Sequence, residues 1–265
     1  MNEETTRAAL VERAANAGAA VATASFRTGI AVETKRSKTD VVTQADRDAQ
    51  RRVIEVIRES FPDDAVVGEE EDALKSVPES GWAWVVDPID GTANYVRDLR
   101  TWATSVAVVH DGEAVAAANV FPALDDSYVS DETGVRRNGE AVRVSERSDP
   151  ETFAVVPFGW WSRDRRGEYA AVTRELVTRF GDMRRPGCAQ AVLSRIAAGS
   201  LDGAVTNVTV NPWDSVAGVH MVRQAGGTVT DVHGEPWRPG DDGLVASNGT
   251  GHDEFLAAVQ SAGGN

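Results

Sequence analysis

Apolar residues recur at helical spacing in the first part of the chain. From Glu4 to about Thr28, an alanine-rich stretch places apolar side chains three and four residues apart, which predicts a long packing helix. The same spacing returns from Asp46 to Ser60, and Pro62 then prevents the helix from continuing. Asp46 therefore lies at a predicted helix start, where the helix dipole favours a carboxylate by roughly 0.3 to 1 kcal/mol.

The middle of the chain changes to short apolar runs that are separated by turns. These runs predict strands at residues 65–70, 82–87, 103–110, 113–121 and 126–130. An Asp-Gly pair at 111–112 and a Thr-Gly pair at 133–134 are typical of turns between antiparallel strands. The pattern therefore predicts an antiparallel sheet built from hairpins.

Beyond about Asp149, strand and helix patterns alternate. The strands are predicted at 152–158, 202–206, 227–231 and 243–248, and the helices near 168–180, near 189–198, from Trp213 onward and at the C-terminal end. Alternation of this kind favours layered packing and an α/β fold class, with α+β character in the first half. We expect the seam at residues 145–150, between an N-terminal α+β half (1–147) and a C-terminal α/β half (148–265).

Length and apolar content indicate a chain that folds by itself. At 265 residues and 28.3 kDa, it can bury a substantial core without a partner. No apolar run approaches the roughly 20 residues of a membrane-spanning helix, and the first residues lack the pattern of a signal peptide. We therefore expect a cytoplasmic protein with no membrane partner. The single cysteine, Cys188, excludes an internal disulfide and a cysteine-based zinc cluster.

The charge is strongly acidic. The formal net charge is −14 and the isoelectric point is about 4.7, and Lys35, Lys38 and Lys75 are the only lysines among otherwise arginine cations. A surface of this sign repels polyanions, so we expect no nucleic-acid partner. A salt-adapted, halophilic host would account for the composition, because salt screens repulsion between surface carboxylates and stability would then rise with KCl.

The candidate chemistry lies directly after the apolar run 82–86. Residues 87–92 read Asp-Pro-Ile-Asp-Gly-Thr, so two carboxylates stand at a strand end beside Gly91, which lets backbone approach an anion. Gly91 and Thr92 can open a helix whose N–H groups face a phosphate. Hard carboxylate oxygens suit Mg²⁺. By itself the motif is equally compatible with an acidic turn that caps a helix.

Four segments together resemble the inositol monophosphatase family of Mg²⁺-dependent, Li⁺-sensitive phosphatases. DPIDGTANY at 87–95 and WDSVAGVHMVRQAGGTVTD at 213–231 resemble the two family signatures, and VVGEEE at 66–71 and KTDVVTQAD at 38–46 resemble its remaining metal and water segments. They occur in the family's order along nearly the whole chain. The resemblance implies a layered αβαβα sandwich of the inositol monophosphatase and fructose-1,6-bisphosphatase type, lithium sensitivity and a homodimer.

The resemblance also assigns roles to individual residues. The implied ligands of two or three Mg²⁺ ions are Glu69, Asp87, the Ile89 carbonyl, Asp90 and Asp214. Asp46 and Thr92 are the implied pair that orients the attacking water and takes its proton, and the amides of Gly91 and Thr92 would hold the phosphate. No covalent intermediate is implied. Carboxylates gathered in this way repel one another, so metal binding is expected to stabilise the fold.

The substrate alcohol is implied by fewer residues. Gly187 and Ala189 match the family loop that contacts the alcohol, and Asp214 is implied to contact it as well. Asn207 stands where inositol-specific members carry an acidic residue, and an amide offers one acceptor oxygen in place of a carboxylate. Asn207 therefore makes broader sugar phosphates plausible, whereas TANY at 92–95 resembles the inositol phosphatase version of the first signature. On that resemblance we rank inositol-1-phosphate first, then fructose 1,6-bisphosphate or other sugar phosphates, then 3′-phosphoadenosine 5′-phosphate. The alternative of a different class is a regulatory or RNA-associated protein on the same fold.

Two further features are considered as parts of a site: the segment that begins at Trp160, which has two open interpretations, and His220. Trp160 and Trp161 precede three arginines, at 163, 165 and 166, and this segment is either a substrate lid with a second anion site or a packed loop with a solvated basic face. His220 lies in the helix that starts at Trp213. We expect it to be structural.

Overall fold

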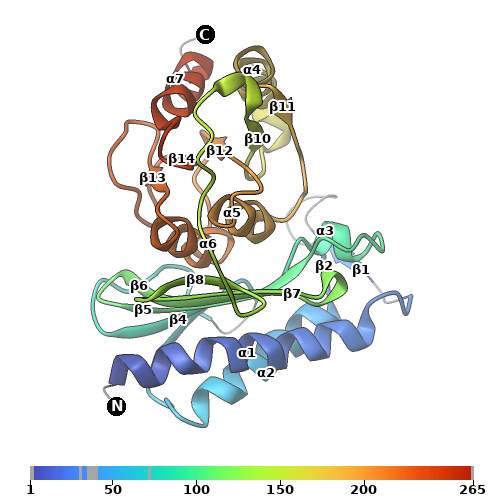
Figure 1. Ribbon diagram of the computed structural model, residues 1–265. Helices are drawn as coiled ribbons and strands as arrows, with labels where there is room; N and C mark the ends of the chain where they lie inside the picture. The colour runs from blue at the N-terminus through green and yellow to red at the C-terminus, as the bar shows by residue number, and fades with distance from the viewer. Residues whose placement is uncertain (1–2, 30–31, 35–40, 71–72, 264–265) are drawn as a thin grey trace.

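The computed structural model describes residues 3–29, 32–34, 41–70 and 73–263, and its layers alternate between helices and sheets (Figure 1). The chain therefore has the predicted αβαβα architecture. Lys35, the residues 38–40 of the predicted water segment and Glu71 lie outside the described residues. The helices are α1 (Glu3–Ser25), α2 (Gln44–Arg58), α3 (Thr92–Tyr95), α4 (Arg166–Arg179), α5 (Ala189–Ala197), α6 (Pro212–Gln224) and α7 (His252–Gly263), with 3₁₀ turns at Pro122–Leu124, Pro150–Thr152 and Arg163–Arg165.

The first sheet has seven strands in sequence order. They are β3 (Ala65–Gly68), β4 (Trp82–Asp90), β5 (Ala103–His110), β6 (Glu113–Phe121), β7 (Asp126–Asp131), β8 (Gly134–Arg137) and β9 (Glu140–Val142). All neighbours are antiparallel except β3 and β4, which are parallel. The prediction of a wholly antiparallel sheet is wrong at this pair, because β3 and β4 run in the same direction, and two parallel strands cannot be joined by a hairpin.

The second sheet has five strands in the order β11-β10-β12-β14-β13. They are β10 (Ala154–Pro157), β11 (Asp182–Met183), β12 (Gly203–Thr206), β13 (Thr228–Thr230) and β14 (Leu244–Ser247). β10 pairs in parallel with β11 and β12, and β14 pairs antiparallel with β12 and β13. A separate antiparallel pair, β1 (Val32–Thr34) and β2 (Val41–Thr43), was not predicted and leads directly into α2.

Strand β4 is buried on both faces of the first sheet. Trp84 and Val86 pack in a core with α1 and α2, whereas Val85 packs in a second core with α5 and α6. A strand covered by helices on both sides has no solvent face, so its sequence is continuously apolar instead of alternating. This burial brings the carboxylates at the end of β4 into the interior of the protein.

The second sheet is also covered on both faces. Val155, Val205 and Val245 pack with α4 and α7, whereas Val156 and Ala204 pack with α5 and α6. Helices α5 and α6 therefore lie between the two sheets, as Figure 1 shows. Because one core extends through both predicted halves, α5 and α6 hold elements of both in fixed relative positions. The boundary at 147/148 itself stays a prediction.

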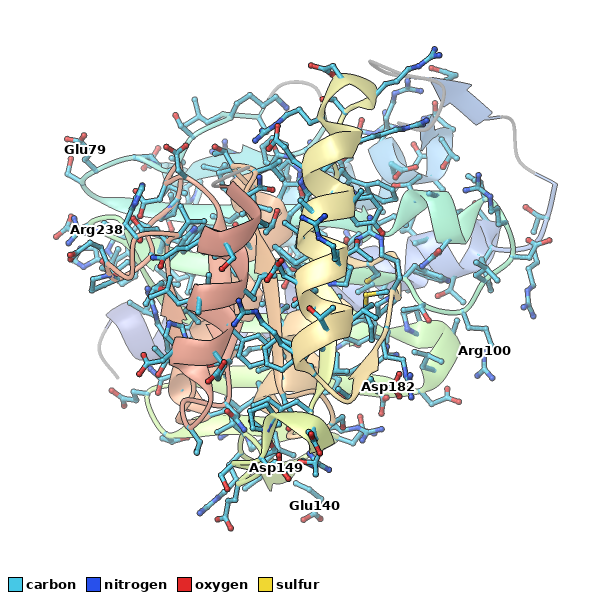
Figure 2. All side chains as sticks on the ribbon, turned by 90° about the horizontal axis from the view of Figure 1, so that it is seen from above. Glu79, Arg100, Glu140, Asp149, Asp182 and Arg238 are labelled. Atoms are coloured by element: carbon cyan, nitrogen blue, oxygen red, sulfur yellow. The ribbon has the colours of Figure 1, made fainter. Side chains whose placement is uncertain are left out.

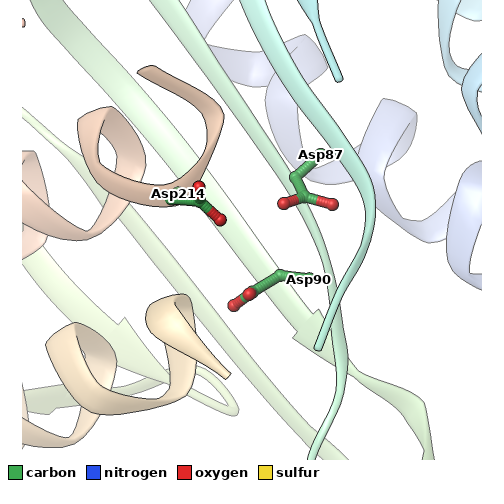
Figure 3. Close-up of side chains that lie close together, drawn as sticks. All are labelled: Asp87, Asp90 and Asp214. Atoms are coloured by element: carbon green, nitrogen blue, oxygen red, sulfur yellow. The ribbon is translucent and has the colours of Figure 1, made fainter. Parts of the chain in front are cut away.

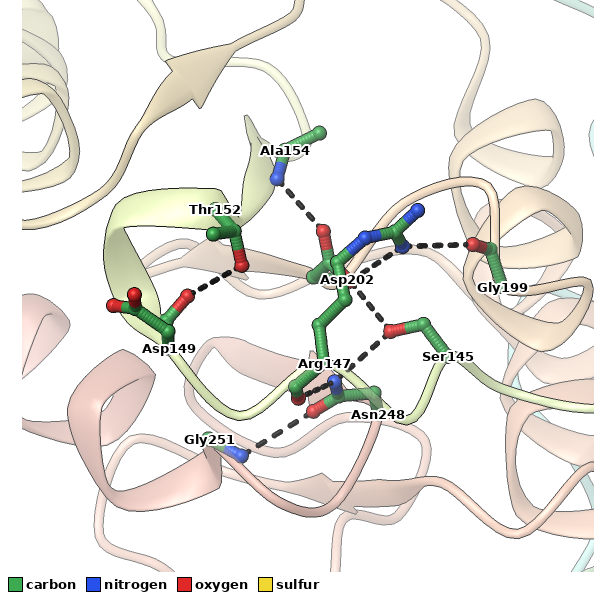
Figure 4. A network of polar contacts seen from close by, with 9 residues as sticks. All are labelled: Ser145, Arg147, Asp149, Thr152, Ala154, Gly199, Asp202, Asn248 and Gly251. Carbon is green, nitrogen blue, oxygen red and sulfur yellow. Dashed lines mark hydrogen bonds and ion pairs between the residues drawn. The ribbon is translucent and has the colours of Figure 1, made fainter.

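The connection between the sheets is tied down by polar contacts (Figure 4). Asp202, whose side chain is 1% exposed, accepts hydrogen bonds from the Ser145 hydroxyl, from Arg147 at 3.1 Å and from the Ala154 N–H at 2.8 Å. Asn248 donates to the Arg147 carbonyl at 2.9 Å. The predicted seam at 145–150 is therefore a fixed connection.

Charged side chains project outward around the periphery (Figure 2). Those labelled in the figure are all exposed: Glu79, Arg100, Glu140, Asp149, Asp182 and Arg238. Within the described part of the chain, no helix has the length and apolar character needed to cross a membrane. His220 on α6 is buried, and burial lowers its pKa to about 4. A neutral, packed histidine agrees with the structural role that we expected.

Candidate metal centre

A bulge in β4 places two aspartates on the same side of the first sheet. Asp87 pairs with Ser105 of β5, and Asp90 pairs with Ala103 of β5. Between these two pairs, β4 therefore has one more residue than β5. Side chains three residues apart on a regular strand point to opposite faces, and one extra residue restores the same face. Pro88, which cannot donate to the ladder, lies within this irregular stretch, and the Thr104 hydroxyl donates to the Pro88 carbonyl at 2.8 Å.

The third aspartate comes from the start of α6. Pro212 begins this helix, Trp213 is buried, and Asp214 follows in the first turn, where the helix dipole favours a carboxylate. The Asn211 amide donates to Asp214 at 2.8 Å. Asp87, Asp90 and Asp214 point toward one another (Figure 3), and each offers an oxygen atom that lies within 4.8 Å of the others.

Asp87 is the least satisfied member of this trio. Its side chain is 1% exposed, and its Oδ1 has no hydrogen-bond partner among the described residues. Burial raises its pKa well above the usual range, and the negative charges of Glu69, Asp90, Asp214 and Asp46 raise it further. A buried, unpaired carboxylate surrounded by other carboxylates is unfavourable unless a cation neutralises it. The trio therefore fits a divalent metal with a preference for hard oxygen ligands.

Asp90 has a second contact that the sequence did not reveal. Its Oδ1 accepts the Ala189 N–H at 3.0 Å, and its Oδ2 accepts the Gln190 N–H at 2.5 Å and the Cys188 thiol at 2.9 Å. These donors open α5, so Asp90 caps that helix from the other sheet. Burial still leaves the pKa of Asp90 raised. The buried Cys188 thiol has a pKa raised well above its usual range by burial and by the charge of Asp90, so it is a protonated donor.

Glu69 lies in a loop that is closed around it. Leu74 pairs with the backbone of Val66 and Gly68, at 2.9 and 3.0 Å, beside β3. The Lys75 ammonium donates to the carbonyls of Gly68, Glu69 and Glu70 at 2.8, 3.0 and 2.7 Å. Glu69 is half-buried, and it is the largest electrostatic contributor to the raised pKa of Asp87 after burial. The loop therefore places Glu69 close enough to raise the pKa of Asp87, but the group of carboxylate oxygens within 4.8 Å of one another contains only the three aspartates.

Asp46 and Thr92 are in direct contact. The Thr92 hydroxyl lies 3.1 Å from Asp46 Oδ1 and 2.9 Å from the Ile89 carbonyl oxygen. Asp46 is fully buried, and its Oδ2 accepts the N–H and the hydroxyl of Thr43 at the start of α2. A hydroxyl has one proton, so Thr92 can donate to only one of its two acceptors at a time. This pair joins α2 to the bulge of β4.

Gly91 has a conformation that requires glycine. Its φ is +88°, and a Cβ there would meet the Cys188 Cβ at 3.0 Å and the Thr101 carbonyl at 3.1 Å. The Asn94 amide donates to the Pro186 carbonyl at 2.8 Å, which docks the 87–95 motif on the 185–190 segment. Gly187 and Ala189 therefore lie beside Gly91 and Asp90, and their contact with a substrate alcohol stays a prediction.

The structure does not place Asn207 with these residues. Its amide accepts the Trp161 indole N–H at 2.7 Å and donates to Glu168 at 2.6 Å. Both polar atoms of this side chain are thus engaged beside α4. A pocket of about 550 Å³, including space open to solvent, is lined in part by Asp214, and Asn207 is not among its lining residues. They are Val156, Pro157, Phe158, Gly159, Trp160, Arg185, Pro186, Gly187, Cys188, Ala189, Val192, Thr209, Val210, Asn211 and Asp214.

Three residues of this region were missed in the sequence. Gln190 is fully buried and links the two signature motifs, because its N–H donates to Asp90 and its amide donates to the Trp213 carbonyl at 2.8 Å. Arg185 lines the pocket. Lys75 had one available signal, since it is a rare lysine in a chain whose cations are otherwise arginine. The contacts of Gln190 and Arg185 join segments that are distant in sequence, so no local pattern reports them, whereas Lys75 reaches back only five to seven residues.

Comparisons with known proteins agree with this geometry. A model of the inositol monophosphatase family matches residues 2–263. A Thermotoga maritima protein named fructose-1,6-bisphosphatase/inositol-1-monophosphatase is 35% identical over 234 residues, which are 86% of this chain and 86% of that protein. The Nus factor SuhB of Escherichia coli is 31% identical over 225 residues, 84% of each. A solved Thermotoga maritima IMPase structure superposes with a TM-score of 0.85 at 30% identity, and the match covers 94% of this chain and 95% of that one.

Proposed function

Because the chain belongs to the inositol monophosphatase family, we propose that it hydrolyses inositol-1-phosphate by direct attack of water, without a covalent intermediate. Family membership makes the protein a metal-dependent phosphoric monoester hydrolase. The proposal adds the substrate, the identity of the metal as Mg²⁺ and the roles of the residues. The observation that carries it is the convergence of Asp87, Asp90 and Asp214, with oxygen atoms within 4.8 Å of one another.

We assign two or three Mg²⁺ ions to the oxygen atoms at this centre. Their ligands are Glu69, Asp87, the Ile89 carbonyl, Asp90 and Asp214. Bound Mg²⁺ supplies a lowered pKa for a water molecule and neutralises charge on the phosphoryl oxygens. The unpaired Oδ1 of Asp87 supports this assignment, because a buried carboxylate oxygen without a donor needs a cation.

The chain's own residues position the remaining reactants. Thr92 orients the attacking water through its hydroxyl, and Asp46, 3.1 Å from that hydroxyl, receives the proton. The Thr43 contacts occupy Oδ2 of Asp46, which leaves Oδ1 as the proton-accepting atom. The amides of Gly91 and Thr92 hold phosphate oxygens, and the left-handed backbone of Gly91 allows the close approach.

The pocket beside Asp214 is the proposed site for the alcohol. Gly187, Ala189 and Asp214 contribute to its lining, and Thr209 and Asn211 add polar groups that can bond hydroxyls. Asn207 remains in the proposal only as a residue that supports the pocket, through Trp161. Its predicted contact with the alcohol lacks structural support, because both polar atoms of its amide are engaged.

Fructose 1,6-bisphosphate is the second candidate substrate. The name of the Thermotoga relative includes this activity, and a cationic residue, Arg185, lines the pocket of this chain. 3′-Phosphoadenosine 5′-phosphate ranks third. A regulatory role of the kind named for the SuhB relative is the alternative of a different class. The clustered carboxylates favour an enzyme, because a regulatory surface has no need of mutually repelling buried acids.

The wider setting is also part of the proposal. We propose a homodimer in the cytoplasm, inhibited by Li⁺ and adapted to salt, with no nucleic-acid partner. The net charge of −14 supports the salt adaptation and the absence of a polyanionic partner. The single cysteine, which offers no internal disulfide, supports the location.

A substrate panel tests the ranking. We expect phosphate release from inositol-1-phosphate, fructose 1,6-bisphosphate and 3′-phosphoadenosine 5′-phosphate in Mg²⁺ to rank in that order by kcat/KM, at low and at molar KCl. A preference for fructose 1,6-bisphosphate above about tenfold, about 1.4 kcal/mol of transition-state stabilisation, would overturn the ranking. Loss of all activity at every salt concentration, despite bound Mg²⁺, would overturn the enzyme assignment.

Replacing Lys75 tests the role of Glu69. Methionine at this position removes three hydrogen bonds from the carbonyls of residues 68–70, so the Glu69 loop should become less ordered. We expect Mg²⁺ affinity to fall about tenfold, since hydrogen bonds to a charged donor contribute about 1.5 kcal/mol or more. Calorimetric titration with Mg²⁺ measures this directly.

The sign of the Lys75 result is informative. If the ammonium acted only as a positive charge near the metals, Lys75→Met would tighten Mg²⁺ binding instead of weakening it. Lys75→Arg is the matched control, because it keeps the charge but a planar guanidinium cannot direct three N–H bonds at three successive carbonyls. Weakened binding in both variants supports positioning, and tighter binding in Lys75→Met rejects it.

A further inference from the structure

Two buried amides in series cross from the first sheet to the helices that cover it. Asn119 lies in β6, Gln190 lies in the first turn of α5, and both side chains are fully buried. The Asn119 amide donates to Gln190 Oε1 at 3.0 Å, and the Gln190 amide donates to the Trp213 carbonyl at 2.8 Å. The two side chains therefore connect β6 and α5 to the start of α6.

The direction of each amide in this series is fixed. A backbone carbonyl can only accept, so the Gln190 amide must turn its NH₂ group toward Trp213, and its oxygen then faces Asn119. Asn119 must in turn present its own NH₂ group. The remaining oxygen of Asn119, Oδ1, is buried and has no partner among the described residues. Because a buried acceptor without a donor lowers stability, packing alone does not account for an asparagine at this position.

Gln190 also contacts the metal centre through its backbone. Its N–H donates to Asp90 Oδ2 at 2.5 Å, and its side chain holds the carbonyl of the peptide bond that leads into Asp214. Asp90 belongs to β4 and Asp214 to α6, and both point into the aspartate trio (Figure 3). One residue therefore connects the two segments that supply these carboxylates.

The packing of α6 leaves room for this connection. Gly218 lies one helical turn after Asp214, and a Cβ at Gly218 would lie 2.8 Å from Gln190 Oε1. The same Cβ would collide with Leu193 of α5. Glycine thus lets the two helices approach closely enough for the Gln190 amide to reach the Trp213 carbonyl.

We propose that Gln190, oriented by Asn119, is a positioning residue that fixes the separation of Asp90 and Asp214 and so favours Mg²⁺ over the larger Ca²⁺. The inference rests on the proposed function, in which both carboxylates are Mg²⁺ ligands. Mg²⁺ requires near-ideal octahedral geometry with ligands at about 2.0–2.1 Å, whereas Ca²⁺ accepts flexible arrangements at about 2.3–2.6 Å. A centre whose carboxylates can move apart therefore loses affinity for Mg²⁺ more than for Ca²⁺.

The test measures the Kd of Mg²⁺ and of Ca²⁺ by calorimetric titration of the wild-type protein and of two variants. Gln190→Leu removes the side-chain connection, and Asn119→Leu/Gln190→Leu replaces both amides by apolar groups of similar size. We expect Mg²⁺ affinity to fall about tenfold in both variants, as is typical when a residue that orients metal ligands is replaced. Ca²⁺ affinity should fall by less than about threefold, because its coordination tolerates the displaced carboxylates.

Stability in EDTA separates positioning from folding. The double variant should melt at the wild-type temperature or above it, because both amides are removed together, including the unpaired Oδ1 of Asn119. Ser194→Ala is the matched control. Ser194 is fully buried one helical turn after Gln190, and its hydroxyl bonds Asn119 at 3.0 Å and Met221 at 3.7 Å, so its loss should leave the Kd of Mg²⁺ unchanged.

Two results would overturn the positioning role. One is unchanged Mg²⁺ affinity in the folded double variant, and the other is an equal loss of Mg²⁺ and Ca²⁺ affinity. Asn119→Leu, which keeps Gln190 but removes the donor that orients it, should shift the ratio of the two Kd values in the same direction. Failure of all three variants to fold in EDTA would assign the amides to folding and reject the inference.

The wild-type titration distinguishes this inference from the proposed function. A wild-type protein that binds no Mg²⁺ would reject the proposed metal centre, and the positioning role with it. Wild-type binding of Mg²⁺ that the folded variants retain in full would reject the positioning role alone.

Discussion

Replacing Asp87 with asparagine is expected to abolish turnover and, at the same time, to stabilise the metal-free protein. Asparagine keeps the shape of the side chain but removes a buried negative charge that four other carboxylates oppose. Because the pKa of Asp87 is raised well above its ordinary value, ionising this carboxylate at pH 8 destabilises the metal-free fold, so we expect the variant to be more stable, by about 1 kcal/mol, as is typical of a single substitution. Activity should fall by about 10³-fold, because a central metal ligand is lost.

The experiment requires two measurements on the same variant. Phosphate release from inositol-1-phosphate in Mg²⁺ gives the loss of activity, and denaturant unfolding in EDTA gives the change in stability. A gain of about 1 kcal/mol corresponds to a melting temperature higher by about 2–4 °C. Asp87 suits this test better than Asp90, because Asp90 accepts three hydrogen bonds at the start of α5 and its replacement disturbs that helix.

Asp202 provides the matched control. It is equally buried, but its oxygens accept hydrogen bonds from Ser145, Arg147 and Ala154, so its negative charge is compensated. Asp202→Asn should lower the free energy of unfolding, by about 1–3 kcal/mol for donors left unpaired, while the metal centre keeps its ligands. If Asp87→Asn and Asp202→Asn destabilised the metal-free protein alike, the trio would not be the electrostatically strained site described here.

Removing the metal is expected to make the protein less stable as the pH rises. The pKa of Asp87 is raised in the folded state above its ordinary value of 3.8, and the pKa of Asp90 is raised as well. The folded protein therefore holds protons that the unfolded chain has released, so this stability is complete below about pH 3.8 and is lost as the pH rises toward the folded pKa values. Mg²⁺ removes the penalty, because its charge favours the ionised carboxylates.

The stabilisation by Mg²⁺ should consequently grow between pH 5 and pH 8. Binding of one ion at a hundredfold excess over its Kd adds about 2.7 kcal/mol to the free energy of unfolding. Denaturant unfolding at each pH, with EDTA and with Mg²⁺, measures the difference. His220, with a pKa lowered to about 4, adds an opposite trend, in which stability rises with pH from about 4 to its ordinary 6.5, but it acts in both samples and cancels. An increment that stays constant with pH would contradict the prediction.

Much of the fold follows from periodicity along the chain. The helices beginning near Glu3, Gln44, Arg166, Ala189 and Pro212 and the main strands of both sheets lie where the apolar spacing predicts them. Each helix buries one apolar stripe and each central strand buries both faces, and the spacing of apolar residues within the element shows this burial pattern. The pairing of β3 with β4 was predicted incorrectly, because an apolar run does not state the direction of the neighbouring strand.

Some parts of the candidate site are likewise visible in the sequence, and others depend on the tertiary structure. The acidic motif at 87–92 and the Trp213-Asp214 pair are visible locally, since a strand end and a helix start have characteristic residues. The bulge that turns Asp87 and Asp90 to one face is not visible, because it depends on the register with β5. Asn207 shows the converse: its position in the sequence suggested a substrate contact, and its neighbours Trp161 and Glu168 engage it elsewhere.

By itself, the sequence determined the layered α/β architecture, the acidic surface and the set of carboxylates that a metal-dependent phosphatase needs. Only the tertiary structure decided that Asp90 caps α5, that Gln190 links the two signature motifs and that Arg185 lines the pocket. The physical reason is the range of each interaction. The apolar spacing and the residues typical of strand ends and helix starts are properties of neighbouring positions, whereas these contacts join segments that are far apart in the chain and are brought together by packing.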